Sequence, residues 1–503
     1  MRLVRPVRRA RAGLLGGVLV VAGALIVAAP GPVAARPVGP GAGIRPVIDP
    51  SVMAGAVDVP VVVQARPGRA GEAARTATKA GGTVGQPLAI IDGFAARLSG
   101  ASLAALAGSP DVVAVTLDRS GTFTSAERRD GGSSDSPYTQ VTGATGAWTS
   151  GLRGQGVTVA VLDTGISPMA DVASRTVHGP DLSGEGTLID SYGHGTVMAG
   201  IIGGDGADSG GRRSGVAPEA GLVAVKVAGR NGAVDVTTVL QGLAWVAAYR
   251  QELGIRVLNL SYGTRSTQDP RLDPLNFAVQ RLWAQGIVVV VAAGNGGADQ
   301  GTITKPGDDP VVLTVGAYDD RGDTAPHNDV VPAWSSQGPT AQGVAKPDIV
   351  APGRTLVATR SYGSAVEQDN PDALVPSSYI KGSGTSEATA VTSGLVALLL
   401  QAHPTWTPDQ VKQALTSTAA PLANTSRNAS GHGRAQLRNA LNADPGAPVR
   451  QPLTATGLGS VEESRGGDHI KAACGVIEGE VDAMCQPWDA EAWTGGTWTG
   501  GTW

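Results

Sequence analysis

The sequence predicts a three-layer α/β fold with a mainly parallel central sheet, preceded by a small α+β domain. Short apolar strands alternate with helical stretches over residues 138–445, a pattern typical of a parallel sheet between helices. Continuous β-branched runs such as Ile287-Val-Val-Val-Val suit strands that are buried on both faces, as parallel strands are. The chain of 503 residues is also long enough for two or three units, one of them with a large core.

The composition narrows the class of protein. Charged residues make up 16% of the chain and aromatic residues 4%, and 72 glycines make it rich in turns, unlike a long helical or a charged disordered protein. The formal net charge of −4 gives no reason to expect a nucleic acid as a partner.

Residues 1–35 have the pattern of a signal peptide. Arginines supply a positive start, an apolar run covers residues 13–29, and small residues at positions 33–35 fit a cleavage site. An uncleaved membrane anchor is the alternative, but the apolar run is short for a span and prolines follow it. We therefore expect a secreted protein. The pair Arg8-Arg9 leaves the choice between general and twin-arginine export open.

Residues 36–57 are rich in Pro and Gly and are interpreted as a linker, and residues 58–123 as a small domain. Two helices on a small antiparallel sheet suit about sixty residues. Residues 124–137 are polar and Gly/Ser-rich, which predicts an exposed linker that is open to cleavage. The expected elements of the small domain are strands over residues 59–64, 89–98 and 112–117 and helices over residues 71–80 and 102–107.

The region 138–445 supplies the elements of the larger domain. One helix is expected over residues 236–252, where Val239, Leu243, Val246 and Ala247 follow the helical period. In such folds, sites form where the carboxyl ends of strands meet the starts of helices. The expected strands cover residues 157–163, 222–227, 256–262, 287–295 and 311–318.

The tail, residues 446–503, ends in a five-residue repeat, Trp-Thr-Gly-Gly-Thr, that carries Trp493, Trp498 and Trp503. It is either a flexible low-complexity tail or an adhesive element for cell-wall material or another protein. The two cysteines of the chain, Cys474 and Cys485, can form one disulfide in an oxidising compartment. Two cysteines without a ligand cluster nearby do not indicate a metal site.

Three short motifs carry the chemistry. They are Val-Leu-Asp-Thr-Gly around Asp163, Gly-His-Gly-Thr around His194 and Gly-Thr-Ser ending at Ser386. A serine hydroxyl becomes a nucleophile at neutral pH only if a base takes its proton and a third group orients that base. Each motif alone also fits a plain turn or loop. Together, in the order Asp, His, Ser, they indicate a triad whose order differs from those of chymotrypsin and the α/β-hydrolases.

With these motifs the region 138–443 resembles the subtilisin-like serine proteases (subtilases, peptidase S8). This resemblance implies a serine endopeptidase that acts on polypeptides, and residues 59–117 resemble the family's inhibitor-I9-like propeptide, which assists folding and blocks the site until it is cut away. Eight segments carry the likeness in order: residues 157–166, 192–196, 215–220, 225–227, 259–263, 291–295, 346–353 and 384–386.

The resemblance and the chemistry assign the roles. Ser386 is expected to attack the scissile carbonyl, His194 to move the proton and Asp163 to orient the imidazole. Asn295 and the Ser386 backbone N–H are expected to stabilise the oxyanion, although an Asn before Gly296-Gly297 also fits a turn.

The resemblance also implies a substrate-binding surface. Its small walls predict tolerance of large uncharged side chains, an inference that Thr304-Lys305 near the pocket floor can change. No cofactor is expected, and no calcium cluster stands out, although the family often carries structural calcium. The implied substrate-binding residues are Ser261, Tyr262, Gly263, Ala292, Ala293 and Gly294 at the primary pocket and Gly229 and Gly232 at the next edge.

Three positions depart from the family pattern: Val197 for a His, Ala390 for a Pro, and Glu387 for the Met that commonly follows the nucleophile. An ionised Glu387 is expected to raise the pKa of His194 and to oppose charge on the oxyanion. A rival function is a catalytically silent protein of this fold that binds cell walls or proteins through its Trp-rich tail.

Overall fold

The computed structural model describes a small domain, a larger domain and the first part of the predicted tail. The predicted signal peptide, both cysteines and the Trp repeat lie outside the described residues. The described residues are 46–48, 59–117, 120–123, 137–376, 378–447, 449–456, 465, 471–472 and 475–476.

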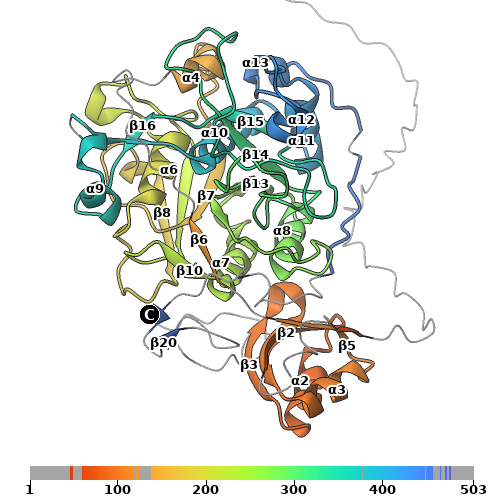
Figure 1. Ribbon diagram of the computed structural model, residues 1–503. Coiled ribbons are helices and arrows are strands. Elements are labelled where there is room, and N and C mark those ends of the chain that lie inside the picture. Colours follow the sequence, from red (N-terminus) through yellow and green to blue (C-terminus); the bar gives the residue numbers. More distant parts are fainter. Residues whose placement is uncertain are drawn as a thin grey trace, which may run out of the picture. The chain divides into compact units, whose positions relative to one another are not determined.

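The core of the larger domain is a seven-stranded sheet in the order β15-β14-β13-β11-β7-β9-β8 (Figure 1). Every neighbouring pair in it is parallel, as the β-branched runs predict. The strands are β7 (Thr158–Asp163), β8 (Thr176–Asp181), β9 (Gly221–Lys226), β11 (Ile255–Leu260), β13 (Val288–Ala292), β14 (Leu313–Tyr318) and β15 (Ile349–Pro352).

Helices cover both faces of this sheet. Near the end of β7, the Leu162 side chain meets Gly242 of one helix, whereas Cβ of the next residue, Asp163, lies beside Gly195 of another. Consecutive side chains of a strand point to opposite faces, so these two helices lie on opposite sides. The predicted three-layer α/β class is confirmed. The main helices are α6 (His194–Gly203), α7 (Val236–Tyr249), α8 (Pro274–Ala284) and α10 (Thr385–Ala402).

Predicted and observed strands differ mainly at their ends. The predicted strand over residues 287–295 stops at Ala292 because Gly294 adopts φ 107°, which leaves the extended region. Asn295 therefore lies in the loop after β13 rather than on the strand. The helix α10 is buried on all sides, which fits the central helix of a large domain.

The small domain is a five-stranded sheet in the order β1-β5-β2-β4-β3 with two helices packed on one face. The predicted strand over residues 89–98 is instead divided, because Asp92 adopts a left-handed conformation (φ 51°) between a 3₁₀ turn and β4. Its elements are β1 (Val47–Ile48), β2 (Val59–Ala65), α2 (Ala70–Lys79), β3 (Thr83–Leu88), η1 (Ala89–Ile91), β4 (Gly93–Leu98), α3 (Gly100–Ala107) and β5 (Val112–Leu117).

The sequence did not predict a third, three-stranded sheet in the order β10-β6-β12. Its strands are β6 (Ser120–Phe123), β10 (Ala233–Asp235) and β12 (Tyr262–Gly263), and both pairings of β6 are antiparallel. In Figure 1 the orange strand β6 lies beside β10. A segment that follows the small domain is thus hydrogen-bonded to two edges of the larger one.

The beginning of the predicted tail contacts the larger domain. The Ala455 N–H donates to Gln280 of α8 (3.0 Å), and Thr456 binds the Arg271 carbonyl oxygen through its N–H (2.7 Å) and its hydroxyl (2.6 Å). Arg465, fully buried, donates through Nε to the Asp235 carboxylate at the end of β10 (2.6 Å). These contacts hold the first part of the tail against the larger domain.

The remaining elements complete the larger domain and its C-terminal extension. They are α4 (Tyr138–Val141), α5 (Ala144–Trp148), η2 (Ala173–Arg175), η3 (Ala207–Ser209), β16 (Leu356–Thr359), α9 (Ala365–Asp369), η4 (Pro371–Ala373), β17 (Leu374–Val375), β18 (Tyr379–Gly382), α11 (Pro408–Ser417), α12 (Arg427–Ser430), α13 (Leu437–Leu441), β19 (Lys471–Ala472) and β20 (Gly475–Val476).

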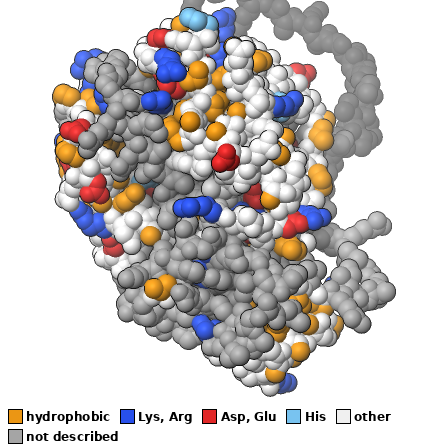
Figure 2. All heavy atoms as spheres, viewed as in Figure 1, with side chains coloured by type: hydrophobic (Ala, Val, Ile, Leu, Met, Phe, Trp, Pro, Cys, Tyr) orange, Lys and Arg blue, Asp and Glu red, His pale blue; other side chains and the backbone are white. Residues whose placement is uncertain are grey.

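Among the described residues, no helix is long and apolar enough to cross a membrane. Within the same residues, no group of three or more His, Cys, Asp or Glu side chains is arranged to hold a metal ion. On the face shown in Figure 2, acidic and basic side chains are interspersed rather than gathered into one charged patch.

Candidate active site

The site starts from a buried pair of an imidazole and a carboxylate. His194 Nδ1 lies 2.8 Å from Asp163 Oδ1 and 3.0 Å from Oδ2, and both side chains are almost completely buried. Asp163 is the last residue of β7 and His194 the first of α6, so the carboxyl end of a strand meets the start of a helix. This geometry fixes one ring tautomer, because the carboxylate accepts from the Nδ1 side.

Glycine is required where these two elements meet. A Cβ added to Gly195 would lie 2.1 Å from the Gly165 carbonyl oxygen and 3.1 Å from Cβ of Asp163. Any side chain there would push α6 away from β7 and separate His194 from Asp163. Close packing of α6 on β7 therefore requires a glycine directly after His194.

A second buried carboxylate, which the sequence analysis missed, organises the loop before His194. Asp190 accepts hydrogen bonds from Thr164 Oγ1 (2.8 Å), the Gly193 N–H (2.7 Å), the Thr196 N–H (2.8 Å) and Thr196 Oγ1 (2.7 Å). Thr164 in turn accepts from the Gly195 N–H (2.9 Å). These bonds tie the start of α6 to the end of β7 and so hold His194 against Asp163.

Ser386 lies in the first turn of α10 and is fully buried. Its backbone carbonyl oxygen accepts a hydrogen bond from Ser261 Oγ (3.2 Å), which joins it to the segment between β11 and β12. The start of a helix favours negative charge because its first N–H groups have no partner within the helix. The surroundings of Ser386 therefore favour an anionic species there.

Asn295 is oriented by the residue before Ser386. Its Oδ1 accepts from both the N–H and the hydroxyl of Thr385, each at 3.0 Å. Because these donors need an acceptor, they fix which end of the amide is oxygen and leave Nδ2 facing the other way. That nitrogen is buried and has no hydrogen-bond partner among the described residues. A buried donor without a partner is costly unless a ligand or intermediate satisfies it.

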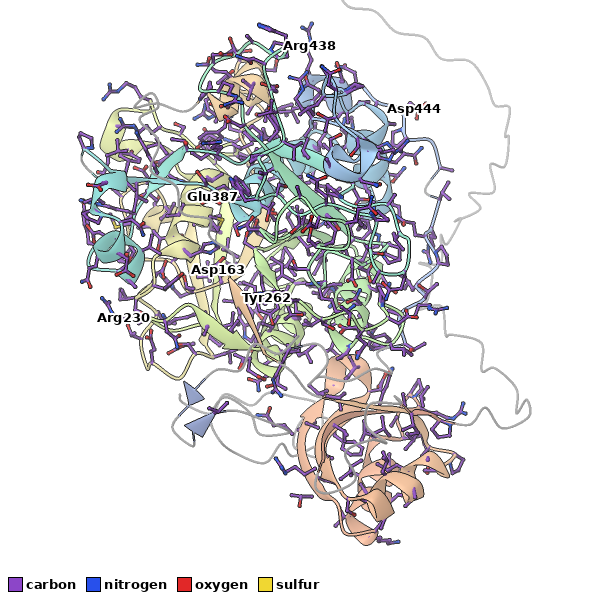
Figure 3. The ribbon with its side chains drawn as sticks, viewed as in Figure 1. Asp163, Arg230, Tyr262, Glu387, Arg438 and Asp444 are labelled. Carbon is purple, nitrogen blue, oxygen red and sulfur yellow. The ribbon has the colours of Figure 1, made fainter. Side chains whose placement is uncertain are left out.

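Glu387 is a third carboxylate close to the imidazole. It is 2% exposed, and Figure 3 shows it within the larger domain, as it does Asp163, whose charge acts on Glu387. Burial raises the pKa of Glu387 to about 7, although the charge of His194 opposes this increase. Burial also lowers the pKa of His194, but Asp163 and then Glu387 outweigh it, so the pKa of His194 lies above its ordinary value.

The predicted substrate-binding residues lie on both sides of this centre. Tyr262 and Gly263 form β12, which pairs with β6, and residues 292–294 end and follow β13. The loop containing Gly229 and Gly232 leads into β10, on the other side of β6. The predicted substrate-binding segments therefore flank β6 on both sides.

Thr304 packs against both Gly263 and Gly294, two of the predicted substrate-binding residues. A Cβ added to Gly263 would lie 2.3 Å from Thr304 Oγ1, and one added to Gly294 would lie 2.7 Å from Thr304 Cγ2, so Thr304 fills the space between the two walls. Lys305 is completely buried and its Nζ binds Asp308 (2.6 Å), which neutralises its charge. Lys305 therefore brings no unpaired charge to the predicted substrate-binding residues.

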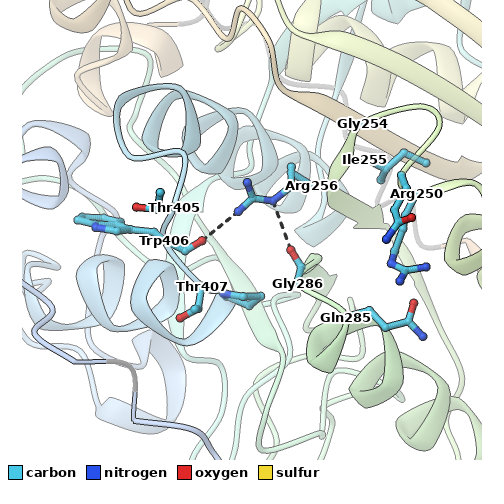
Figure 4. Close-up of a pocket in the computed structure, with 11 residues that line it drawn as sticks. Arg250, Gly254, Ile255, Arg256, Gln285, Gly286, Thr405, Trp406 and Thr407 are labelled. Carbon is cyan, nitrogen blue, oxygen red and sulfur yellow. Dashed lines mark hydrogen bonds between the residues drawn. The ribbon is translucent and has the colours of Figure 1, made fainter. Parts of the chain in front are cut away.

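A separate pocket of about 480 Å³ lies at the amino ends of β11 and β13, opposite the carboxyl ends that carry the site (Figure 4). Its central cation, Arg256, donates to the carbonyl oxygens of Pro404 (2.8 Å), Trp406 (2.9 Å) and Gly286 (3.4 Å). The guanidinium thus holds the loop between α10 and α11, which is a structural role.

Comparison with known proteins decides the family. A model of the subtilase family matches residues 154–438, more than half of the chain. The chain belongs to the subtilase family. Serine protease AprX of Bacillus subtilis is 40% identical over 296 residues, which cover 58% of this subtilase and 67% of AprX. Subtilisin Savinase of Lederbergia lenta is 36% identical over 281 residues, which cover 56% of this subtilase and 90% of Savinase.

A solved structure shows the same fold. Fervidolysin from Fervidobacterium pennivorans superposes with a TM-score of 0.58 at 21% identity, over 80% of this subtilase and 64% of the fervidolysin chain. The prediction of a subtilisin-like serine endopeptidase is confirmed by the family and its named protease relatives.

Proposed function

We propose that this subtilase is a secreted endopeptidase that hydrolyses polypeptides with Asp163, His194 and Ser386 and is made as a self-processed zymogen. The pairing of His194 Nδ1 with Asp163 at 2.8 Å carries the proposal, because it leaves Nε2 as the ring atom that can take a proton. The signal-peptide pattern of residues 1–35 supports secretion.

The reaction then runs in two halves. Ser386 Oγ attacks the scissile carbonyl carbon while His194 takes its proton, and the imidazolium formed is stabilised by Asp163. His194 next donates the proton to the leaving amine, which departs and leaves an acyl group on Ser386. A water molecule, activated by the same imidazole, releases the acyl group and restores the serine.

The oxyanion of each tetrahedral intermediate is held by two donors, Asn295 Nδ2 and the Ser386 N–H. The buried Nδ2 atom without a partner supports this role, and Thr385 fixes its direction. Removing such a donor from subtilisin is known to lower kcat by about 10²–10³-fold, a magnitude that we borrow from subtilisin itself.

The strand β6 supports self-processing. Antiparallel addition of a peptide to exposed strand edges is a general way to bind an extended substrate. Residues 120–123 occupy that place between β10 and β12, with Phe123 opposite Tyr262 and Thr122 opposite Gly263. The last described pair, Phe123 and Tyr262, lies next to Ser261, whose hydroxyl binds the Ser386 carbonyl oxygen. We infer that the chain is cut after Thr124 and that the small domain acts as an inhibitory propeptide.

The test is processing of the purified precursor. Wild-type protein is expected to release a mature chain that begins at Ser125, as read by N-terminal sequencing, whereas Ser386→Ala accumulates uncut. Asn328→Ala, away from the proposed centre, is the matched control and is expected to process normally. Normal processing of Ser386→Ala in a protease-free refolding assay would refute self-cleavage.

A catalytically silent binding protein is the rival. Labelling with a fluorophosphonate separates the two functions, since only an activated serine reacts rapidly. Label on the wild type that Ser386→Ala lacks supports the protease, and equal labelling of both contradicts the proposed nucleophile.

A further inference from the structure

The residue after the proposed nucleophile carries a carboxylate that the triad chemistry does not use. Glu387 is 98% buried, and its Oε2 has no hydrogen-bond partner among the described residues. A Cβ added to Gly382 of β18 would lie 2.3 Å from Glu387 Oε1, so the carboxylate rests directly on a glycine. This packing holds it inside the catalytic centre, and a larger residue at Gly382 would displace it.

The charged groups that face Glu387 come from two elements. His194 of α6 favours its ionised form, and Asp163 of β7 opposes it. The negative charges of Asp163 and Asp190 in turn raise the pKa of His194. On β18 the neighbouring Lys381 projects from the face opposite to that of Gly382, because side chains alternate along a strand. Glu387 therefore interacts chiefly with the imidazole.

We propose that Glu387 is a positioning residue whose buried charge favours the protonated form of His194 and thereby sets the lower pH limit of hydrolysis. This inference rests on the proposed function, because it requires His194 to be the base. The two residues then titrate as a pair, and the acid limb of the rate profile belongs to the pair rather than to the imidazole alone.

The direction follows from the charges. At high pH the pair holds no proton, Glu387 is anionic, and His194 is a neutral base that can accept the Ser386 proton. On lowering the pH, the anion favours protonation of His194 and so inactivates the base at a higher pH than a neutral neighbour would. Burial raises the pKa of Glu387 to about 7, so a second proton binds within the same pH range.

Glu387→Gln isolates this effect, because it keeps size and removes charge. We expect the acid limb of the pH profile of kcat/KM to shift to lower pH by about half to one and a half pH units. The acid limb should also change shape. In the wild type it reflects proton loss from both His194 and Glu387, whereas in the variant it reflects proton loss from His194 alone. A substrate without ionisable side chains keeps the profile specific to the enzyme.

Two variants control the experiment. Glu252→Gln removes one exposed carboxylate just beyond α7 and is expected to leave the limb in place. Glu387→Met gives a second neutral residue of similar length, which serves if the Gln variant folds poorly. Both neutral variants at position 387 must shift the limb in the same direction, because a shift in one alone would indicate a packing effect and overturn the proposal.

The outcomes for the inference and for the proposed function are separate. If Ser386→Ala is inactive but the wild-type and Glu387→Gln profiles superimpose, the electrostatic role of Glu387 is wrong and the triad stands. If Ser386→Ala or His194→Ala retains wild-type activity, the proposed function itself fails. A lower-pH limb in both neutral variants, with the Glu252→Gln profile unchanged, supports the inference.

Discussion

At the scale of the residue, the proposed catalytic centre depends on the groups that orient each reacting atom. The Asp163 carboxylate orients the His194 ring at 2.8 Å, and Thr385 fixes both the position and the sense of the Asn295 amide. Small changes at such positions should therefore affect the rate more than the stability.

Asn295→Ala tests the oxyanion donor. The substitution removes Nδ2 without touching the triad, so kcat is expected to fall by about 10²–10³-fold, the effect known for subtilisin, with KM little changed. Steady-state kinetics on a peptide anilide measure both constants. A drop of less than twofold in kcat would assign Asn295 to the turn before Gly296 instead.

Thr385→Val tests the orientation of that amide. The valine keeps the shape of threonine but removes the hydroxyl that donates to Asn295 Oδ1 at 3.0 Å. The same hydroxyl also accepts a hydrogen bond from the Gly294 N–H (3.1 Å), which the valine removes as well. We expect kcat to fall less than in Asn295→Ala, by roughly tenfold, because hydrogen bonds between uncharged groups contribute about 1 kcal/mol each and the bond from the Thr385 N–H to Asn295 remains. The double variant should be no slower than Asn295→Ala, and additive losses would contradict the shared mechanism.

At the scale of the element, the start of α10 combines catalytic and structural demands. The buried Glu387 has a pKa raised to about 7 in the folded state, against an ordinary 4.5. An acid whose pKa is raised by folding stabilises the protein below its unfolded pKa, and this contribution is lost as the pH rises through the folded pKa. The wild-type fold should therefore weaken between about pH 5 and pH 8.

Chemical denaturation at the two pH values measures this effect. The Ser386→Ala background prevents self-digestion. In it, the free energy of unfolding should fall by on the order of 3 kcal/mol between these pH values when Glu387 is present, and this fall should disappear in Glu387→Gln. Equal pH dependence with and without Glu387→Gln would show that the carboxylate is solvated and not buried.

Some elements of the fold and the candidate site could be predicted from the sequence, and others could not. The motifs placed Asp163 and His194 at a strand end and a helix start, where the structure has them. The sequence analysis missed Asp190 and Thr385 because an Asp before Ser-Tyr-Gly and a Thr before Ser have no periodic signal of their own. It missed β6 because its partners, β10 and β12, lie more than a hundred residues further along the chain.

At the scale of the whole molecule, the C-terminal extension has two parts with different expected roles. Arg465 makes a fully buried ion pair with Asp235, which also caps α7 through the Thr237 N–H at 2.9 Å. Removing one member of a buried pair commonly costs about 3–5 kcal/mol, because the other charge is left uncompensated. A truncation after Pro445 would therefore disturb β10 as well as remove the tryptophans.

Truncation after Val476 separates these parts. It removes the Trp repeat but keeps Arg465, so peptide hydrolysis is expected to equal that of the full chain while binding to cell-wall material is lost. A sedimentation assay with purified walls measures the bound fraction. Unchanged partitioning of the shortened enzyme would leave the repeat as a passive tail, and truncation after Pro445 should lower the melting temperature in addition.

The central claim is that Ser386 is the nucleophile, activated by His194 and Asp163. Mass spectrometry of mature enzyme after reaction with a fluorophosphonate tests it most directly. We predict a single phosphonyl adduct on the peptide that contains Ser386, with labelling reduced by several orders of magnitude in His194→Ala. An adduct on any other residue, or equally fast labelling of His194→Ala, would contradict the account.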